Sequence, residues 1–272
     1  MSYSQEEKQK YAKEKVKELT GKLEEGVKEL FESGDFSKYL SFISMDAFRK
    51  YSWNNCMLIL AQYPTASYVA GFKTWEKEFK RYPKKGEKAI NILAPSKYKK
   101  KVKKKDENGN ETDEEEEIEM FNYRSVPIFD VNQTEGELIP DFNTKLNEDI
   151  EDCDVLVDAL IRVSSLPVNF QKGNKTGEIN IDPTAHDQQL IKELTAEICK
   201  EELRKKQYPT VLSEGITYVI CEHYGIDTSG QTFVNMAAWG KDKETKELKQ
   251  AMKIIKEESM TMIEKLDKII EE

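Results

Sequence analysis

Apolar residues recur at every third or fourth position near the start of the chain, which is the spacing of one buried face of a helix. That face consists of Val16, Leu19, Leu23, Val27 and Leu30. Ser4 and Glu7 have the spacing of a capping box, and Gly34 can end a helix in the left-handed conformation. We therefore predict a helix over residues 5–32, followed by a short helix at residues 36–43.

The next elements follow from apolar runs and turn residues. The stretch SMDAFRKYSWNNCMLILAQYP is rich in large apolar residues and predicts a buried helix that ends before Pro64. Thr74 can cap a helix in TWEKEF. Pro83 and Gly86 then mark a turn, and KAINILAP alternates between apolar and polar positions as a half-buried strand does.

Residues 97–123 predict a long hairpin, because an Asn-Gly dipeptide separates YKKKVKKK from EEEEIEMFNY. Antiparallel pairing would place a lysine-rich strand opposite a glutamate-rich strand, and opposite charges across a strand pair stabilise it. We therefore expect the hairpin to neutralise much of its own charge. The following segment, RSVPIFDVNQTEG, predicts a strand that leaves this part of the chain.

The second half predicts mainly helices. After a linker at residues 141–147, DIEDCDVLVDALIRVS predicts a helix, and LPVNFQ and GEINID predict two short strands with a Gly-Asn turn between them. Helical patterns follow at residues 187–205, 209–224 and 230–239. The last segment, 243–271, has a heptad seam, interrupted by Ser259, that consists of Leu248, Met252, Ile255, Met262, Leu266 and Ile269. We expect this helix to pack on the chain itself, which favours a monomer; dimerisation is the alternative.

These patterns predict an α+β protein with two domains, residues 1–142 and 143–272, each a small sheet packed with helices, and a long C-terminal helix. The length of 272 residues is sufficient for two cores. No apolar run approaches the ~20 residues of a membrane span, and the N-terminus lacks the apolar region of a signal peptide. Four scattered cysteines without a Cys-x-x-Cys pair favour reduced thiols. We therefore expect a cytoplasmic protein with no membrane partner.

Basic residues are concentrated in one segment of an acidic chain. The formal charge is -9 overall, whereas residues 73–105 contain fourteen basic and three acidic side chains, a local charge of +11. Residues 143–272 carry 17 basic and 25 acidic side chains. The overall charge argues against nucleic-acid binding, but a basic segment with interleaved aromatic residues is typical of proteins that bind single strands.

Three segments of the first half occur in the order and spacing of a known domain. They read YSWNNCMLILAQYP, AGFKTWEKEFKRYPKKGEKAINILAP and SVPIFDVNQTEGE. Over residues 36–140 the chain resembles the N-terminal single-stranded-DNA-binding domain of ArdC-type antirestriction proteins and of the LtrC-like proteins of mobile elements. One departure is Ala89, where these proteins often have Gly after Gly-Glu-Lys.

The candidate DNA-binding residues combine aromatic rings, amides and cations. They are Tyr51, Trp53, Asn54, Asn55, Lys73, Trp75, Lys77, Lys80, Arg81, Tyr82, Lys84, Lys85 and Lys88. Bases stack on aromatic rings, which contributes about 1–3 kcal/mol per base, while cations contact phosphates. Trp53, Phe72 and Trp75 could instead be core residues, so both interpretations stay open at this point.

The second half resembles the ImmA/IrrE-like zinc metallopeptidase domain, most clearly in SEGITYVICEHYGIDTSGQTFVNMAAW. That family carries His-Glu-x-x-His on its active helix, with a Glu from the next helix as the third ligand. The corresponding positions here are Ala196, Glu197 and Lys200, and Glu214 stands at the place of the third ligand. Both histidines are missing, so the resemblance implies no metal, no cofactor and no peptidase activity. We expect Lys200 to replace the metal electrostatically between the two glutamates; a solvated helix face is the alternative.

The resemblance therefore implies a single-stranded-DNA-binding protein of a plasmid, conjugative element or phage, which shields DNA from restriction without bond chemistry. A second hypothesis is a protein-interaction module whose acidic second half binds a host restriction or defence enzyme. A third is a metallopeptidase with substitute ligands, for which Cys199 joins Glu197 and Glu214 as a candidate.

Overall fold

The computed structural model describes residues 4–105, 111–138, 153–173 and 177–272. Its first part contains, in order, α1 (Gln5–Ser33), α2 (Ser37–Ser44), η1 (Asp46–Phe48), α3 (Trp53–Gln62), β1 (Val69–Ala70), α4 (Phe72–Glu78), β2 (Arg81–Pro83), β3 (Ile90–Lys105), β4 (Glu111–Asp130), η2 (Val131–Gln133) and β5 (Thr134–Gly136). The second part contains α5 (Cys153–Val163), β6 (Val168–Phe170), β7 (Ile179–Ile181), α6 (Asp187–Lys205), η4 (Thr210–Leu212), α7 (Ser213–His223), α8 (Val234–Gly240) and α9 (Thr245–Ile270). The predicted α+β class and the long C-terminal helix are confirmed.

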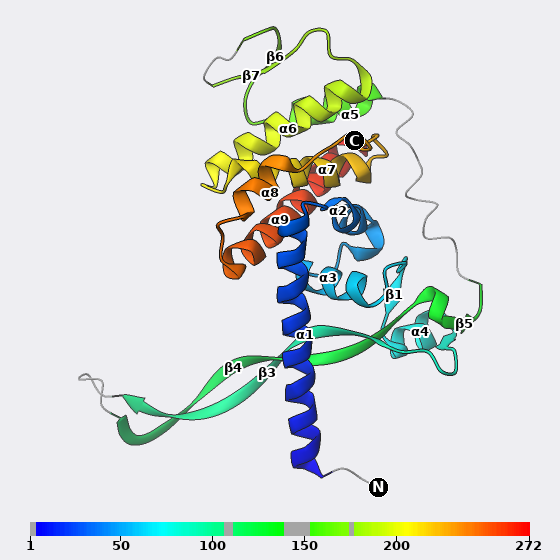
Figure 1. The fold of residues 1–272 in the computed structure, drawn as a ribbon, viewed down its shortest axis with the longest axis vertical. Helices are drawn as coiled ribbons and strands as arrows, with labels where there is room; N and C mark the ends of the chain where they lie inside the picture. Colours follow the sequence, from blue (N-terminus) through cyan, green and yellow to red (C-terminus); the bar gives the residue numbers. More distant parts are fainter. Residues whose placement is uncertain (1–3, 106–110, 139–152, 174–176) are drawn as a thin grey trace.

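Helix α1 begins and ends as the sequence predicts. The Ser4 and Glu7 side chains form the capping box with each other's backbone N–H groups, and Gly34 ends the helix at φ 71°. The C-terminal half of α1 buries its apolar face, while its N-terminal half extends beyond the rest of the molecule (Figure 1).

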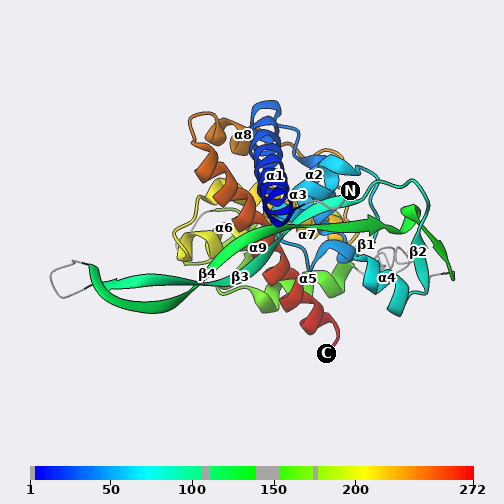
Figure 2. The ribbon, with the colours of Figure 1, turned by 90° about the horizontal axis from the view of Figure 1, so that it is seen from below.

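The predicted hairpin belongs to a longer one, formed by β3 and β4. The two strands pair in one register from Ile90 opposite Ile128 to Lys103 opposite Glu115, and the register shifts before Lys105 opposite Glu111, so KAINILAP and RSVPIFD are the base of the same hairpin and not separate strands. The tip extends away from the helices (Figures 1 and 2). The Asn-Gly turn lies outside the described residues.

The charge pairing across the hairpin is confirmed in the backbone register, which places Lys99 opposite Glu119 and Lys101 opposite Glu117. The strand segment 111–119 carries seven acidic residues, which reduce the +11 of residues 73–105 to +4 when both are counted. The register therefore places an acidic residue opposite Lys99, Lys101, Lys103 and Lys105, an arrangement that stabilises a strand pair.

Three local predictions were wrong. The helix expected from Ser44 onward is divided, because η1 ends at Phe48 and α3 begins only at Trp53, with the Ser52 side chain accepting from the Asn55 N–H. Thr74 lies inside α4, whose N-cap is Gly71. Strands β6 and β7 run parallel, with Val168 opposite Ile179, so no tight hairpin turn can join them. The predicted linker at residues 141–147 lies outside the described residues.

Helix α9 packs its heptad seam against α7, α5 and α1 of the same chain. Met252, Ile255 and Leu266 are fully buried, and so is Ser259, whose hydroxyl donates to the Ile255 carbonyl 2.7 Å away. This internal bond satisfies the one polar residue of the seam. The prediction that the helix packs on its own chain is therefore confirmed.

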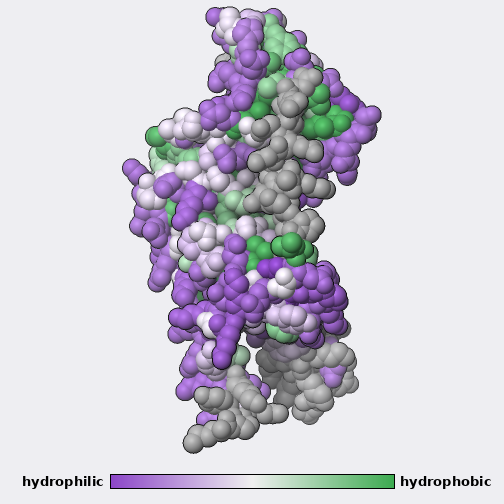
Figure 3. Space-filling view, turned by 90° about the vertical axis from the view of Figure 1, so that its right-hand side faces the viewer, coloured by the Kyte–Doolittle hydropathy of each residue, from purple (hydrophilic) through white to green (hydrophobic). Residues whose placement is uncertain are grey.

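One hydrophobic core runs through both parts of the chain, because α2 packs on α7 and α1 packs on α8 and α9. The division into two domains at residue 142 stays a prediction. Figure 3 shows one face of the molecule, on which hydrophobic residues form small patches within a mainly hydrophilic surface. Among the described residues, no helix combines the length and apolar character that a membrane crossing needs.

The contact between α8 and α1 leaves no room for a side chain at Gly240, because an added Cβ would overlap the Phe31 ring. We expect Gly240→Ala to lower the free energy of unfolding by about 1–3 kcal/mol, the usual cost of overpacking a core. Gly21→Ala is the matched control: nothing lies within 4 Å of its added Cβ, and it should stabilise α1 by up to ~1 kcal/mol. Urea unfolding of both variants measures the difference, and equal effects would contradict this packing.

Candidate nucleic-acid interface

The predicted DNA-binding residues lie in two separate places. Tyr51, Trp53, Asn54 and Asn55 line a groove of about 1010 Å³, which we call the α3–α9 groove. The remaining candidates lie on residues 71–88, which we call the α4–β2 lobe. The groove has one wall from residues 49–55 and the base of the β3–β4 hairpin, and another from α9.

The first wall of the groove combines a fixed aromatic residue, Tyr51, with a neighbouring cation, Lys50. The Tyr51 hydroxyl donates to the Val69 carbonyl at 2.8 Å, and burial raises the pKa of Tyr51 to about 12. The Lys50 ammonium lies 5.6 Å from the centre of the Tyr51 ring and 5.4 Å from that of Tyr68. Lys50 is exposed, so it presents a cation beside an aromatic surface.

The two neighbouring asparagines at the start of α3, Asn54 and Asn55, have different surroundings. Asn55 donates to the Leu93 carbonyl at 3.0 Å and accepts from the Leu93 N–H at 2.9 Å, so its amide holds α3 to β3. Asn55 also lines the groove, so its proposed DNA contact stays a prediction beside this structural role. In the described part of the chain, the buried Asn54 Oδ1 has no hydrogen-bond partner. Trp53 is only 8% exposed and contributes an edge of the groove.

The α4–β2 lobe divides its candidates into structural and exposed residues. Trp75 is fully buried and donates from Nε1 to the Phe129 carbonyl at 3.0 Å, so it is a core residue and not a platform for bases. Arg81 donates to the Thr134 carbonyl at 2.8 Å and to the Glu137 carbonyl at 2.5 Å, which holds β5 in place. The structure thus settles the alternative that the sequence left open for Trp75 in favour of the core, and Arg81 has structural hydrogen bonds.

Two lysines of the lobe are also engaged: Lys80 donates to the Lys77 carbonyl and Lys84 to the Asn132 carbonyl, each at 3.0 Å. Phe72 and Tyr82 are each 48% exposed, with ring centres 6.4 Å apart. The exposed lysines of the lobe that surround this pair in sequence are Lys73, Lys77, Lys85 and Lys88. The lobe thus keeps one aromatic pair and several cations for a ligand.

Residues 129–133, which read FDVNQ in the third family-like segment, have a structural role. Asp130 is fully buried and accepts from the backbone N–H groups of Ser67 and Tyr68 at 2.8 and 3.1 Å. Gln133 donates to the Lys88 carbonyl at 2.8 Å and accepts from the Asp130 N–H at 3.0 Å. The block therefore fixes the lobe against the end of β4.

The groove residues that sequence patterns missed include Arg49 and Lys50 before α3, Tyr123 on β4 and Lys253 on α9. Tyr123 lies opposite Pro95 in the strand register and is 54% exposed. Lys50 directly precedes the aromatic candidate Tyr51, which is the one local signal that could have found it. No local sequence signal identifies Lys253, because only the tertiary packing of α9 brings it to the groove.

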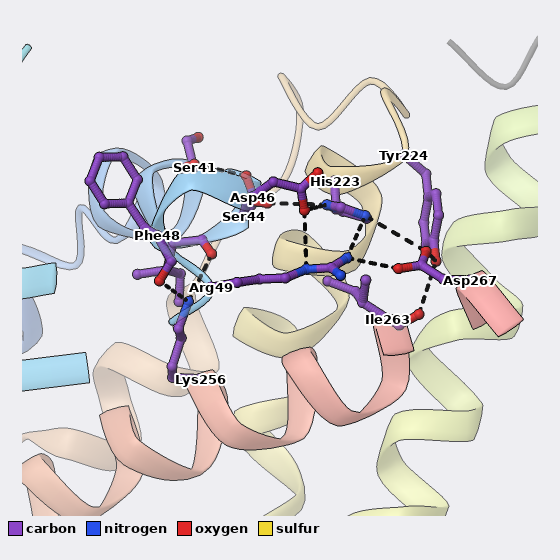
Figure 4. Close-up of polar contacts among 11 residues, drawn as sticks. Ser41, Ser44, Asp46, Phe48, Arg49, His223, Tyr224, Lys256, Ile263 and Asp267 are labelled. Atoms are coloured by element: carbon purple, nitrogen blue, oxygen red, sulfur yellow. Dashed lines mark hydrogen bonds and ion pairs between the residues drawn. The ribbon is translucent and has the colours of Figure 1, made fainter. Parts of the chain in front are cut away.

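Behind the groove, Arg49 belongs to a polar cluster that joins η1, α7 and α9 (Figure 4). Its Nη2 donates to Asp267 Oδ2 at 2.8 Å and lies 3.1 Å from His223 Nε2. The Nδ1 atom of His223 lies 3.1 Å from the Ser44 carbonyl oxygen, which can only accept. Nδ1 therefore carries the proton and Nε2 accepts from Arg49, so this geometry requires a neutral imidazole.

The remaining groups of this cluster are carboxylates and a phenol. Asp46 Oδ1 lies 3.0 Å from Arg49 Nε, and Tyr224 donates to Asp267 Oδ1 at 2.8 Å. Burial lowers the pKa of His223, and although the Ser44 carbonyl, Asp46 and Asp267 oppose this effect, they do not outweigh it. The cluster thus has a neutral histidine between two carboxylates and one guanidinium.

A second groove, of about 670 Å³, lies between β7 and α6, where the sequence resemblance places its degenerate peptidase motif. Ala196, Glu197 and Lys200 line it, and Lys200 Nζ lies 2.6 Å from Glu197 Oε1. Glu214 accepts instead from Asn235 Nδ2 at 2.5 Å and from the Met236 N–H at 3.1 Å, at the start of α8. The expected bridge of Lys200 between two glutamates is therefore half present: within the described part of the chain, Lys200 pairs with Glu197 and not with Glu214.

Residues 9–129 match the family profile described as the N-terminal domain of anti-restriction factor ArdC. The match covers a little under half of the chain, and it includes every candidate of the first wall and of the lobe. It ends before α9.

Two solved structures of the antirestriction protein ArdC from plasmid R388 are similar to this chain. The metal-free form has 15% sequence identity and a TM-score of 0.46, and the alignment covers 86% of this chain and 98% of that one. The Mn(II)-bound form has 16% identity and a TM-score of 0.45, with 81% of this chain and 89% of that one covered. A comparison with curated protein sequences found no match.

The side chains of the β7–α6 groove do not fit a three-ligand metal centre. Across residues 4–105, 111–138, 153–173 and 177–272, no group of three or more His, Cys, Asp or Glu side chains is arranged to hold a metal ion. Lys200 adds a cation directly on the Glu197 carboxylate. Because a catalytic zinc site needs three protein ligands, we derive no chemistry through a metal here.

The lowered pKa of His223 predicts a pH-dependent stability. Below the ordinary histidine pKa of about 6.5, the unfolded chain binds a proton that the folded chain excludes. The free energy of unfolding is therefore highest above that pH. It declines as the pH falls, by at most ~1.4 kcal/mol per pH unit for one group. We expect His223→Gln to lose less stability than the wild type between about pH 7.5 and about pH 5.

The control for this experiment is His186→Gln, at the exposed N-cap position of α6. Its urea-unfolding profile should follow the wild-type pH slope. A His223→Gln profile parallel to that of the wild type would show that His223 is not the titrating group.

Proposed function

We propose that this protein binds single-stranded DNA in the α3–α9 groove and shields that DNA from host restriction enzymes by occupancy. The observation that carries the proposal is a groove with both aromatic surface and cations in one place, in particular Tyr51 and Tyr123 beside Lys50 and Lys253. Single strands expose base faces that stack on aromatic rings and a backbone that attracts cations. The match of residues 9–129 to the ArdC N-terminal domain supports the antirestriction role.

The setting of this activity is part of the same proposal. ArdC from plasmid R388 is an antirestriction protein, and DNA of a mobile element or phage must evade restriction when it enters a cell. We propose a cytoplasmic site of action, for which the free state of Cys56, Cys153, Cys199 and Cys221 is suitable. The mechanism requires no bond chemistry and no cofactor.

The second part of the chain is proposed to be a peptidase-like domain without activity. The support is chemical: Lys200 lies on the Glu197 carboxylate, and alanine stands one position before that glutamate. We expect elemental analysis of protein purified without chelators to find only substoichiometric zinc and manganese. One firmly bound metal ion per chain would instead favour a metallopeptidase with substitute ligands.

Fluorescence anisotropy with labelled single-stranded and duplex oligonucleotides tests the DNA-binding proposal. We expect preference for the single strand, with a salt slope of about -0.7 for each phosphate contacted. Lys50→Ala should weaken binding about tenfold, which corresponds to the roughly 1.5 kcal/mol of one charged hydrogen bond. The matched control is Lys38→Ala, an exposed lysine of α2 that does not line the groove.

Lys84→Glu combined with Lys85→Glu tests the α4–β2 lobe separately. A loss of affinity in this variant, with Lys50→Ala unaffected, would move the binding surface from the groove to the lobe. Absence of binding at low salt would reject single-strand binding and favour the protein-interaction hypothesis, in which the acidic residues 143–272 bind a host enzyme.

A further inference from the structure

We infer that α9, from the second part of the chain, is a DNA-binding wall of the groove, so that one bound strand contacts both parts of the protein at once. This inference rests on the proposed function and names a contributor that lies beyond the family match, which ends at residue 129. Residues 253–261 of α9 face Tyr51, Trp53 and Tyr123 across the same groove.

The groove face of α9 has the chemistry that a nucleotide needs. Lys253 is half exposed, with its Nζ 3.8 Å from Glu257 Oε1 on the next turn, a distance at which a surface ion pair is weak. A phosphate can therefore compete for this ammonium. Met260 is partly buried against the core and offers a polarizable thioether, which makes favourable contacts with flat aromatic rings such as a base.

The acidic residues of this wall do not cancel its cation. Glu258 forms a 2.5 Å ion pair with Lys206, the residue that directly follows α6, and only 18% of the Glu258 side chain is exposed. Glu257 has 62% of its side chain exposed and can turn to solvent. Together with Lys50 on the opposite wall, Lys253 places cations on both sides of the groove. The phosphate backbone of a single strand between the walls would then lie near both cations, Lys50 and Lys253.

The two walls are held at a fixed separation by bonds below the groove. Lys256, only 4% exposed, donates from Nζ to the carbonyls of Ile43 and Phe48 at 3.1 and 3.3 Å, and Arg49 forms its ion pair with Asp267. These bonds connect α9 to the segment that leads into α3. The groove therefore exists before a ligand arrives, and binding does not require the cost of assembling it.

Photocrosslinking of the full-length protein to oligonucleotides that carry 5-iododeoxyuridine tests this inference directly. We expect crosslinked peptides from residues 253–261 as well as from the wall that contains Tyr51, Trp53 and Tyr123. In parallel, Lys253→Ala should weaken single-strand binding and reduce the salt slope by about 0.7, the contribution of one phosphate contact. Lys246→Ala is the control, an exposed lysine at the start of the same helix and outside the groove.

The outcomes separate this inference from the proposed function. Crosslinks to the first wall alone, with Lys253→Ala and Lys246→Ala both binding as the wild type does, would overturn the role of α9 and leave DNA binding intact. Failure of the wild-type protein to bind any single strand would overturn both the role of α9 and the proposed function. The binding isotherm of the wild type shows this outcome without any variant.

Discussion

The arrangement of the whole molecule depends on how α9 is attached to the segment between α2 and α3. Lys256 is buried with its ammonium on the carbonyls of Ile43 and Phe48, which lie at the C-terminal ends of α2 and η1. Burying a charge is costly unless hydrogen bonds satisfy it, and the negative ends of helix dipoles provide partners of the right sign. Burial lowers the pKa of Lys256. Arg49 and Asp267 add an ion pair of 2.8 Å between the same elements. Because α3 starts only four residues after Arg49, these bonds set where the groove lies.

The fold changes which basic residues are expected to contact a ligand. Residues 73–105 have the largest positive charge in the sequence, yet the β3–β4 register places acidic residues opposite many of these lysines. Arg81 and Lys84 are also engaged with backbone carbonyls. The groove has fewer cations, but they lie beside aromatic surface on two walls. For a ligand with alternating phosphates and bases, this combination is more effective than a larger charge that faces acidic residues on the neighbouring strand.

Local patterns were sufficient for the long helices. The capping box of α1, its apolar face and the seam of α9 are all periodic signals, and each of these helices begins and ends within a few residues of the prediction. The break between η1 and α3 was not predictable, because Phe48 and Trp53 are both buried and continue the apolar pattern through the break. The separation of the candidate residues into two places has the same cause. Tyr51 and Trp53 were identified from their neighbours in sequence, whereas Trp75 and Asn55 are engaged by strands far along the chain. Arg49 and Asp267 are 218 residues apart, so no local pattern could connect them.

Hydrogen–deuterium exchange with and without a single-stranded oligonucleotide is the most direct test that DNA occupies the α3–α9 groove. The account predicts slower exchange on DNA binding in two segments together, residues 49–55 at the start of α3 and residues 253–261 of α9. Protection confined to residues 72–88 of the lobe, with no change in either wall of the groove, would contradict it.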